Sequence, residues 1–152
     1  MKSVFYAGSF NPFTEGHADI VKRLLSLADE VIIGIGVNLE KPESSRRAKE
    51  NSIFIDSWIK NNKLSDRIKV VVYDGLTGEE ALTHGADCLA RGVRNSSDFD
   101  YEYSLASVNR DAFGLETLLI PANPSLSFVS SSMLRDIISH GKNDLAEKYL
   151  PK

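Results

Sequence analysis

The stretch that decides the fold runs from Ser3 to His17 and reads Ser-Val-Phe-Tyr-Ala-Gly-Ser-Phe-Asn-Pro-Phe-Thr-Glu-Gly-His. Its apolar start, residues 3–7, predicts a strand that ends at Gly8. Apolar residues at helical spacing predict a helix over residues 18–28. A glycine after a buried strand lets the backbone approach a ligand, and the start of a helix presents free N–H groups that favour a phosphate. We therefore expect a phosphate-binding turn, with Thr14 as the N-cap and His17 donating from the first helical turn.

Strands and helices alternate through the rest of the chain. The pattern predicts strands at residues 31–37, 68–73, 88–90 and 117–120, helices at residues 46–61, 79–84, 99–113 and 131–140, and a terminal turn or helix at residues 145–150. In the helix at residues 46–61, we expect the packing face to hold Ile53, Phe54, Trp58 and Ile59. Because crossovers between parallel strands are right-handed, the alternation predicts an α/β fold. The expected architecture is a doubly wound, Rossmann-like five-stranded parallel sheet with helices on both faces, which binds ligands at the carboxyl ends of its strands.

Composition limits the class of protein. The chain has 152 residues, of which 42% are hydrophobic and 26% charged, so we expect one globular domain over residues 1–152. A formal net charge of -3 argues against nucleic acid or an anionic membrane as the main partner. The single Cys88 excludes an intrachain disulfide framework and a multi-cysteine zinc site. No apolar run approaches the ~20 residues of a membrane span, and the N-terminus lacks the apolar stretch of a signal peptide, so we expect a cytoplasmic protein.

A second motif follows the fourth predicted strand. It reads Arg91-Gly92-Val93-Arg94, and Asp98-Phe99-Asp100-Tyr101-Glu102 comes shortly after it. Arginine forks bind phosphate oxygens in a bidentate manner, and glycine allows backbone contact with a base or a ribose. The carboxylate of Glu102 suits ribose hydroxyls. The alternative is a salt-bridged helix start, in which Asp98 and Asp100 pair with the two arginines.

A third motif follows the fifth predicted strand and opens a helix. It reads Ser127-Phe128-Val129-Ser130-Ser131-Ser132. Serine hydroxyls and free helix N–H groups form an anion site without charged side chains. The alternative is a serine-rich N-cap with no ligand.

The first motif, Gly8-Ser9-Phe10-Asn11-Pro12 with Thr14-Glu15-Gly16-His17, resembles the signature of the nucleotidyltransferase superfamily. With the two later motifs, the chain resembles the phosphopantetheine adenylyltransferase family from about Val4 to Arg135. The resemblance implies transfer of AMP from ATP to 4′-phosphopantetheine, which gives dephospho-coenzyme A and pyrophosphate in coenzyme A biosynthesis. It also implies a direct, in-line attack with no covalent intermediate. The resemblance also implies Mg²⁺ bound through the ATP phosphates, no protein ligands to a metal, and a homo-oligomer, commonly a hexamer.

The resemblance implies a role for each matching position. The catalytic positions are His17, Lys41 and Arg91, with His17 as the transition-state stabiliser. The ATP-binding positions are Ser9, Phe10, His17, Gly92, Val93, Arg94, Glu102, Leu126, Ser127, Phe128, Val129, Ser130, Ser131 and Ser132. The positions that bind the acceptor substrate are Ser9, Lys41, Thr77, Arg91 and Asn109.

The chain also departs from the family pattern. Asn11 replaces the usual aspartate, and the segment after Lys41 lacks the usual aromatic residue and Glu-x-Arg-like helix start. Whether Lys41 or Arg46/Arg47 contacts the acceptor phosphate therefore stays open. One alternative function is a nicotinate or nicotinamide mononucleotide adenylyltransferase, although such enzymes usually carry a second histidine where this chain has Thr14. Another is a non-catalytic nucleotide-binding regulator of the same fold.

Overall fold

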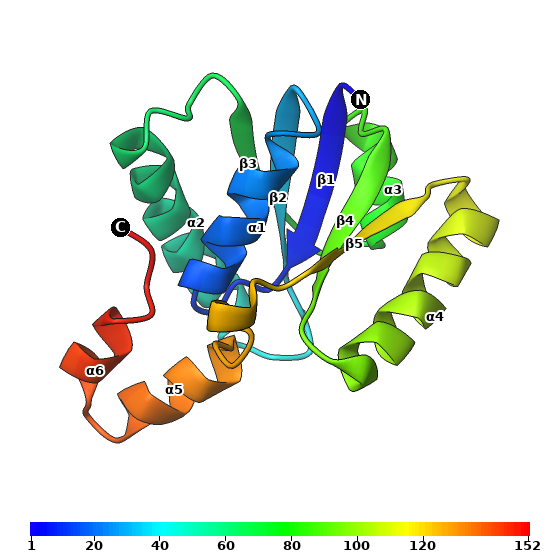
Figure 1. Cartoon of the computed structure of the whole chain (residues 1–152). Helices are drawn as coiled ribbons and strands as arrows, with labels where there is room; N and C mark the ends of the chain where they lie inside the picture. The colour runs from blue at the N-terminus through cyan, green and yellow to red at the C-terminus, as the bar shows by residue number, and fades with distance from the viewer.

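All residues from Met1 to Lys152 are described by the structure, a computed structural model shown in Figure 1. Five parallel strands form one sheet in the order β3-β2-β1-β4-β5. The strands are β1 (Ser3–Gly8), β2 (Glu30–Gly36), β3 (Ile68–Tyr73), β4 (Cys88–Val93) and β5 (Thr117–Pro121). The helices are α1 (Glu15–Leu24), α2 (Ser44–Asn61), α3 (Thr77–Thr83), α4 (Ser96–Phe113), the 3₁₀ turn η1 (Pro124–Leu126), α5 (Ser131–Ser139) and α6 (Asn143–Glu147).

The strand order confirms the predicted doubly wound, Rossmann-like α/β fold. The chain starts in the middle of the sheet with β1, adds β2 and β3 on one side, and then crosses to add β4 and β5 on the other. The direction of winding reverses between β1 and β4. Ligands of open α/β sheets bind at such a reversal, beyond the carboxyl ends of the two strands.

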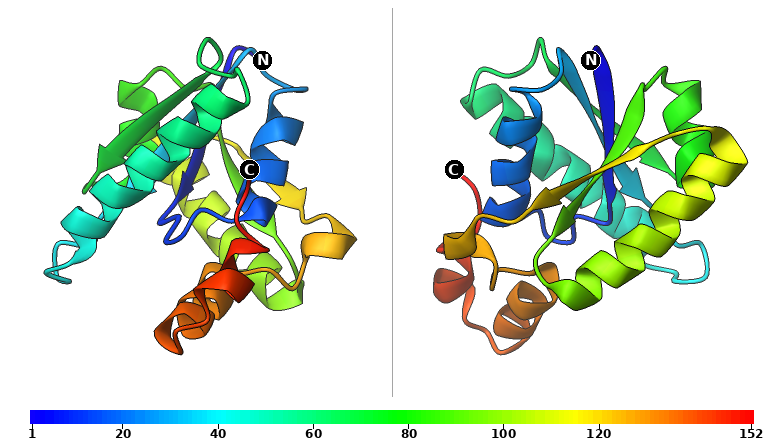
Figure 2. Two further views of the ribbon diagram at one scale, coloured as in Figure 1. Left: turned by 90° about the vertical axis from the view of Figure 1, so that its left-hand side faces the viewer. Right: turned by 45° about the vertical axis from the view of Figure 1, so that its right-hand side comes forward.

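Helices cover both faces of the sheet, as Figure 2 shows. Successive side chains of a strand point to opposite faces. Val4 and Tyr6 of β1 belong to the larger core cluster, which includes residues of α1 and α2. Phe5 and Ala7 belong to a smaller cluster with residues from α3 and the end of α4. Burying an apolar side chain such as Phe5 stabilises the folded state by roughly 1.5–3 kcal/mol. Because the side chains of β1 alternate between the two faces of the sheet, this strand packs against the helices of both layers.

The packing face of α2 differs in part from the prediction. Trp58 and Ile59 are buried as expected, but Ile53 is 62% exposed and Phe54 is 37% exposed. Ile55 is fully buried instead. It precedes Trp58 and Ile59 by three and four residues and therefore shares their side of the helix. The prediction was wrong for Ile53 and Phe54 because apolar residues stand on more than one side of this helix.

Several boundaries also differ. The first helix starts at Glu15 and ends at Leu24, whereas residues 18–28 were expected. It ends early because the N–H groups of Ser26 and Leu27 bond carbonyls only three residues back, in a tighter turn. The helix α4 starts three residues earlier than expected, at Ser96.

The strand β4 continues to Val93 instead of ending at residue 90. It is prolonged by pairing with β5, in which Arg91 lies opposite Leu119 and Gly92 lies opposite Ile120. Arg91 and Gly92 therefore belong to the strand itself, whereas the sequence placed them beyond it.

The C-terminal segment lies beyond the carboxyl ends of the strands, where Figure 1 shows α5 and α6 in orange and red. Hydrogen bonds join it to the loop after β1 and to the start of α1. The Glu15 N–H donates to the Tyr149 carbonyl at 2.8 Å, and Nη1 of Arg135 donates to the Asn11 carbonyl at 2.6 Å. No helix combines the length and the apolar character that a membrane crossing requires.

Candidate active site

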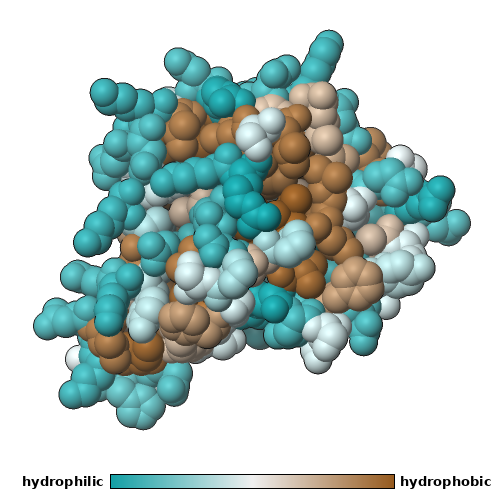
Figure 3. Space-filling view, in the orientation of Figure 1, coloured by the Kyte–Doolittle hydropathy of each residue, from teal (hydrophilic) through white to brown (hydrophobic).

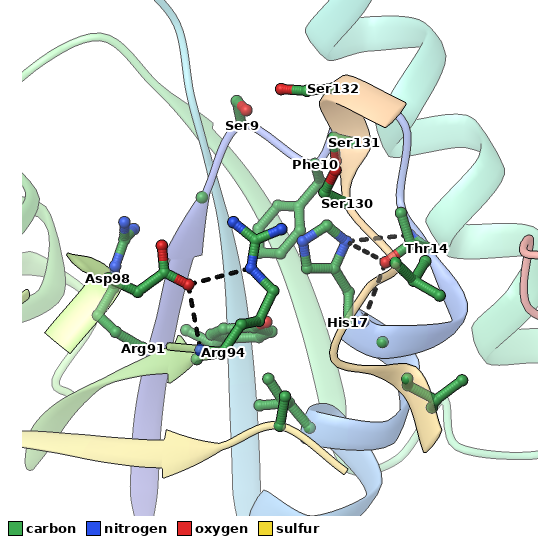
Figure 4. A pocket seen from close by; sticks show the side chains of 18 of the residues that line it. Ser9, Phe10, Thr14, His17, Arg91, Arg94, Asp98, Ser130, Ser131 and Ser132 are labelled. Carbon is green, nitrogen blue, oxygen red and sulfur yellow. Dashed lines mark hydrogen bonds and ion pairs between the residues drawn. The ribbon is translucent and has the colours of Figure 1, made fainter. Parts of the chain in front are cut away.

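A cleft of about 300 Å³ opens at the carboxyl ends of β1 and β4, where the sheet reverses its winding. All three sequence motifs line it, and Figure 4 shows their side chains converging. The predicted site residues that line the cleft are Ser9, Phe10, His17, Arg91, Gly92, Arg94, Glu102, Leu126, Val129, Ser130, Ser131 and Ser132. Segments far apart in the sequence thus form one pocket, as expected from the ends of parallel strands.

Thr14 and His17 form a reciprocal cap at the start of α1. The Thr14 hydroxyl accepts a hydrogen bond from the His17 N–H at 3.2 Å, and the Thr14 N–H donates to Nδ1 of His17 at 3.0 Å. This confirms Thr14 as the N-cap. A main-chain N–H can only donate, so Nδ1 must be the unprotonated nitrogen of a neutral ring. The proton of the neutral imidazole therefore lies on Nε2, which remains available to donate a hydrogen bond.

The surroundings of His17 keep its ring neutral. Burial and the positive charges of Arg94 and Arg91 lower the pKa of His17 to about 4. The Phe13 ring is stacked on the imidazole with centroids 5.7 Å apart, and the Phe10 ring meets it edge-on at 5.0 Å. At neutral pH the cleft thus holds a neutral, fixed donor beside two cations.

Arg91 is held by a buried carboxylate. Its Nε and Nη2 each lie 2.8 Å from an oxygen of Glu102, and its Nη1 donates to the Ala7 carbonyl at 2.7 Å. Burial works against the charge of Arg91, but the hydrogen bonds and charge of Glu102 outweigh it, and the pKa of Arg91 is raised. Glu102 is only 5% exposed and is the one buried residue of α4. The pair fixes the start of α4 against β4 and β1.

Arg94 lies on the open side of the cleft. Its Nε is 3.0 Å from Oδ2 of Asp98, which also accepts a hydrogen bond from the Arg94 main-chain N–H. Figure 4 shows the guanidinium of Arg94 beside the imidazole of His17. Of the ion pairs weighed from the sequence, Arg94 with Asp98 is present, whereas Arg91 pairs with Glu102 instead of Asp100.

Gly92 meets a packing constraint that the sequence did not reveal. A Cβ at this position would lie 2.5 Å from Cδ1 of Ile20 and 3.9 Å from the Tyr6 hydroxyl. The absence of a side chain lets α1 approach β4 closely and leaves the Gly92 backbone on the cleft wall.

The third motif begins α5 and connects it to the first loop. The Ser130 hydroxyl accepts a hydrogen bond from the Met133 N–H at 3.1 Å, which makes Ser130 the N-cap. The Ser131 hydroxyl donates to the Pro12 carbonyl at 2.8 Å. The serine cap weighed from the sequence is therefore present, and the capped helix start lines the cleft.

Two residues of this motif lie outside the cleft. The Ser127 hydroxyl donates to the Pro124 carbonyl at 3.1 Å. Phe128 is 58% exposed, and its ring meets the Tyr149 ring edge-on at 5.8 Å. Neither residue lines the cleft.

A second cavity, of about 470 Å³, adjoins the cleft on the side of α2. Lys41 lines this cavity and not the first one. Ser9 and Arg135 line both, so the two spaces share a wall. Three further predicted residues line neither cavity: Val93, Thr77 and Asn109. The Thr77 hydroxyl is 2.9 Å from the Tyr73 hydroxyl, and the Asn109 amide donates to the Leu105 carbonyl.

Arg135 and Tyr6 are among the residues of the cleft that the sequence motifs missed. Arg135 lines both cavities and bonds the Asn11 carbonyl and the Ser132 hydroxyl. The sequence could have indicated Arg135, because it follows Ser132 by three residues on the same helix and therefore lies on the same helix face. Tyr6 also lines the cleft, although its place within the apolar strand β1 predicted only a core residue.

No group of three or more His, Cys, Asp or Glu side chains gathers anywhere in the chain to hold a metal ion. The two carboxylates of the cleft, Asp98 and Glu102, are paired with arginines. The donor set of the cleft is therefore made of cations, hydroxyls and N–H groups, which suits phosphate oxygens.

Comparison with known proteins places the chain in a family. The model of the family "Cytidylyltransferase-like" matches residues 5–137. The phosphopantetheine adenylyltransferase of Porphyromonas gingivalis is 42% identical over 150 residues, 97% of this chain and 92% of that protein. The protein of the same name from Flavobacterium johnsoniae is 39% identical over 141 residues, 93% of this chain and 90% of that protein.

Solved structures share the fold at low sequence identity. A bifunctional NMN adenylyltransferase/ADP ribose pyrophosphatase from Francisella tularensis has a TM-score of 0.65 and 16% identity, over 92% of this chain and 42% of that one. A putative nicotinate-nucleotide adenylyltransferase from Vibrio parahaemolyticus has a TM-score of 0.58 and 17% identity, over 100% of this chain and 95% of that one. The structural likeness shows the fold, and the sequence likeness along nearly the whole length is much stronger. The chain belongs to the cytidylyltransferase-like family and, within it, to the phosphopantetheine adenylyltransferases.

Proposed function

We propose that this chain transfers AMP from ATP to 4′-phosphopantetheine, giving dephospho-coenzyme A and pyrophosphate. The observation that carries the proposal is the convergence of His17, Arg91 and Arg94 in one cleft with a serine-capped helix start. The basic second cavity shares the Ser9 wall of that cleft. Two phosphorylated substrates bound in the two spaces would meet at this wall, which is the arrangement that a direct transfer requires.

The reaction needs no covalent enzyme intermediate. An oxygen of the acceptor phosphate forms a bond to the α-phosphorus of ATP, while the bond from that phosphorus to the bridging oxygen breaks. The electron pair of the broken bond leaves with pyrophosphate. The acceptor phosphate is already a nucleophile near neutral pH, so catalysis depends on positioning and on neutralising charge as it develops.

His17 is placed to stabilise the negative charge that develops on the α-phosphate during the transfer. Its Nδ1 accepts a hydrogen bond from the Thr14 N–H, which fixes the ring. The Nε2–H group of this ring is therefore a donor of fixed orientation in the wall of the cleft. A donor that does not reorganise during the reaction stabilises a transition state more than water does. We assign to His17 a hydrogen bond to the α-phosphate oxygens that strengthens in the transition state.

The cations and N–H groups bind the rest of the triphosphate. Arg91 and Arg94 lie beside His17, and the start of α5 offers its capped turn with Ser130 to Ser132. If Mg²⁺ is bound through the ATP phosphates, as the resemblance implies, it would lower the charge repulsion among them. The paired state of Asp98 and Glu102 fits a metal held by the nucleotide rather than by the protein.

The remaining predicted contacts are part of the same proposal. Gly92 and Val93 would bind the nucleotide through the backbone, and Leu126 and Val129, which line the cleft, would also contact ATP. On the acceptor side, Lys41 would bind the phosphate, and Asn109 would meet the pantetheine arm. The other acceptor contacts would come from Ser9, Thr77 and Arg91.

A pyrophosphate-release assay with ATP, Mg²⁺ and 4′-phosphopantetheine tests the function. We expect turnover with 4′-phosphopantetheine and none with nicotinate or nicotinamide mononucleotide, offered separately at the same concentration. Turnover of a mononucleotide alone would identify the other adenylyltransferase activity. ATP binding without pyrophosphate release from any of the three acceptors would favour a non-catalytic regulator.

We also propose a homo-oligomer, for which the family resemblance suggests a hexamer. Apolar side chains gather between α1 and α4 on the face shown in Figure 3, beside the edge strand β5. The exposed apolar residues of α4 are Phe99, Tyr101, Tyr103 and Val108. A second copy could cover these surfaces and the unpaired edge. Light scattering after size exclusion measures the mass of the assembly directly.

We further propose a cytoplasmic location, where ATP for the reaction is available.

A further inference from the structure

Phe13 lies against the imidazole of His17 but lines neither of the two cavities. Its side chain is fully buried. The two rings are stacked, with an angle of 20° between their planes and 5.7 Å between their centroids. Offset stacking is a favoured arrangement of two flat rings. Phe13 therefore covers a face of the imidazole without reaching the space that the substrates would occupy.

Two further rings hold Phe13 in place. The Trp58 ring, from α2, lies 5.2 Å from it at an angle of 59°, and the Phe10 ring lies 5.8 Å from it at 64°. Trp58 and Phe10 are each 2% exposed. Because protein interiors are close-packed, side chains buried among one another keep a defined orientation. The surface that Phe13 offers to His17 is thus fixed by contacts with α2 and with the loop after β1.

Contact with the flat face of the imidazole adds a second restraint to the Thr14 hydrogen bond. That bond anchors the ring at one atom, Nδ1. The direction of Nε2–H also depends on rotation of the ring about its bond to Cβ, and this rotation has no sharp preference of its own. A ring stacked on the imidazole limits the rotation. Misplacing a catalytic group by about 1 Å can lower a rate about 10²-fold, so the restraint matters for the reaction.

Phe13 also occupies a position that often has a purely structural role. It directly precedes Thr14, the N-cap of α1. An apolar residue there commonly packs against the first turns of the helix and fixes the entry of the chain, and an aliphatic side chain serves this purpose too. Here the stacked partner is His17, in the first turn itself. Only the contact with the imidazole calls for a flat ring.

Resting on the proposed function, we infer that Phe13 is a positioning residue, whose ring holds the His17 imidazole in the plane that directs Nε2–H at the reacting phosphate and keeps water from the covered face. The ionisable groups that line the cleft with His17 are Tyr6 of β1, Arg91 and Arg94 of β4, Asp98 and Glu102 of α4, and Arg135 of α5. Phe13 carries no charge, so replacing it changes the hydration and orientation of the imidazole and leaves these groups in place.

Phe13→Leu tests the inference, because it keeps an apolar side chain before the N-cap and removes the flat ring. Burial is the largest cause of the lowered pKa of His17. Water that reaches the uncovered face should therefore raise this pKa, by about one unit in an NMR titration of the substrate-free protein. In the pyrophosphate assay we expect kcat to fall about tenfold, while KM for each substrate stays within about twofold of the wild type.

Phe5→Leu is the matched control. Phe5 is also fully buried, but it belongs to the smaller core cluster and its ring is stacked on His84. The same substitution there should leave the pKa of His17 and kcat unchanged, even where it lowers the midpoint of urea unfolding. An unchanged pKa of His17 or an unchanged kcat in Phe13→Leu would overturn the inference, as would equal losses of kcat in the two variants.

A double variant shows whether Phe13 acts through His17. In a His17→Ala background, Phe13→Leu should lower kcat no further, because the ring that it positions is already absent. A further tenfold loss would assign Phe13 another role and contradict the inference. If the wild-type chain releases no pyrophosphate, the proposed function fails, whereas the imidazole titration still decides whether Phe13 covers and holds the ring.

Discussion

Arg91 and Glu102 form a two-pronged ion pair in which two guanidinium nitrogens each lie 2.8 Å from a different carboxylate oxygen. The pair joins β4 to α4 across the wall of the nucleotide cleft. The pair holds the Arg91 guanidinium in position before substrate binds. The same guanidinium also donates a hydrogen bond to the Ala7 carbonyl, which connects it to β1. The geometry of the site thus depends on a pair that also contributes to the fold.

Replacing Arg91 should therefore destabilise the protein. Arg91→Met leaves the Glu102 carboxylate, whose side chain is 7% exposed, without its counter-charge. We expect the free energy of unfolding in urea to fall by about 3 kcal/mol. Arg94→Met is the matched control, because the more exposed pair of Arg94 with Asp98 contributes less than about 1 kcal/mol. Equal losses in the two variants would contradict the structural role of the Arg91 pair.

Removing the imidazole of His17 should reduce kcat much more than it changes substrate binding. We expect His17→Ala to lower kcat by ~10²–10³, the size of effect reported for one lost transition-state donor. His17→Gln keeps an N–H donor on a side chain of similar reach and should restore part of the rate. Pyrophosphate release at saturating substrates measures kcat, and near-normal turnover by His17→Ala would refute the assigned role.

The lowered pKa of His17 should make stability depend on pH in acid. Its pKa falls from 6.5 to about 4 on folding because of burial and the charges of Arg94 and Arg91. Between these two values the unfolded chain binds a proton that the folded chain does not, so stability falls as the pH drops from 6.5 towards 4. The slope from this group is at most about 1.4 kcal/mol per pH unit. Urea unfolding at several pH values should show a smaller slope for His17→Gln, and an unchanged slope would contradict the assignment.

The Tyr6 hydroxyl should contribute to ATP binding. Burial raises the pKa of Tyr6, so the hydroxyl stays protonated, and it lies on the floor of the nucleotide cleft. Tyr6→Phe removes only this oxygen. We expect KM for ATP to rise about three- to tenfold, the cost of one lost hydrogen bond, while the midpoint of urea unfolding changes little. An unchanged KM for ATP would show that the hydroxyl makes no contact with the nucleotide.

The sequence by itself determined the fold and the location of the chemistry. Apolar strands followed by amphipathic helices predicted a parallel sheet, and each motif came directly after a strand. Because all parallel strands end at the same edge, the motifs of His17, Arg94 and Ser130 had to meet there. The Thr14 cap was also readable, since capping depends only on residues three apart.

Only the tertiary structure decided which side chains pair and which share a cavity. Glu102 and not Asp100 holds Arg91, because the choice depends on how α4 is rotated against β4. A Cβ at position 92 would displace the end of the Ile20 side chain, a contact between α1 and β4 that no local pattern encodes. Arg47 faces a cavity whose walls come from distant segments, whereas Arg46 does not. The physical reason is that periodicity reports which face of an element is buried, while pairing and cavities arise from the distances between elements.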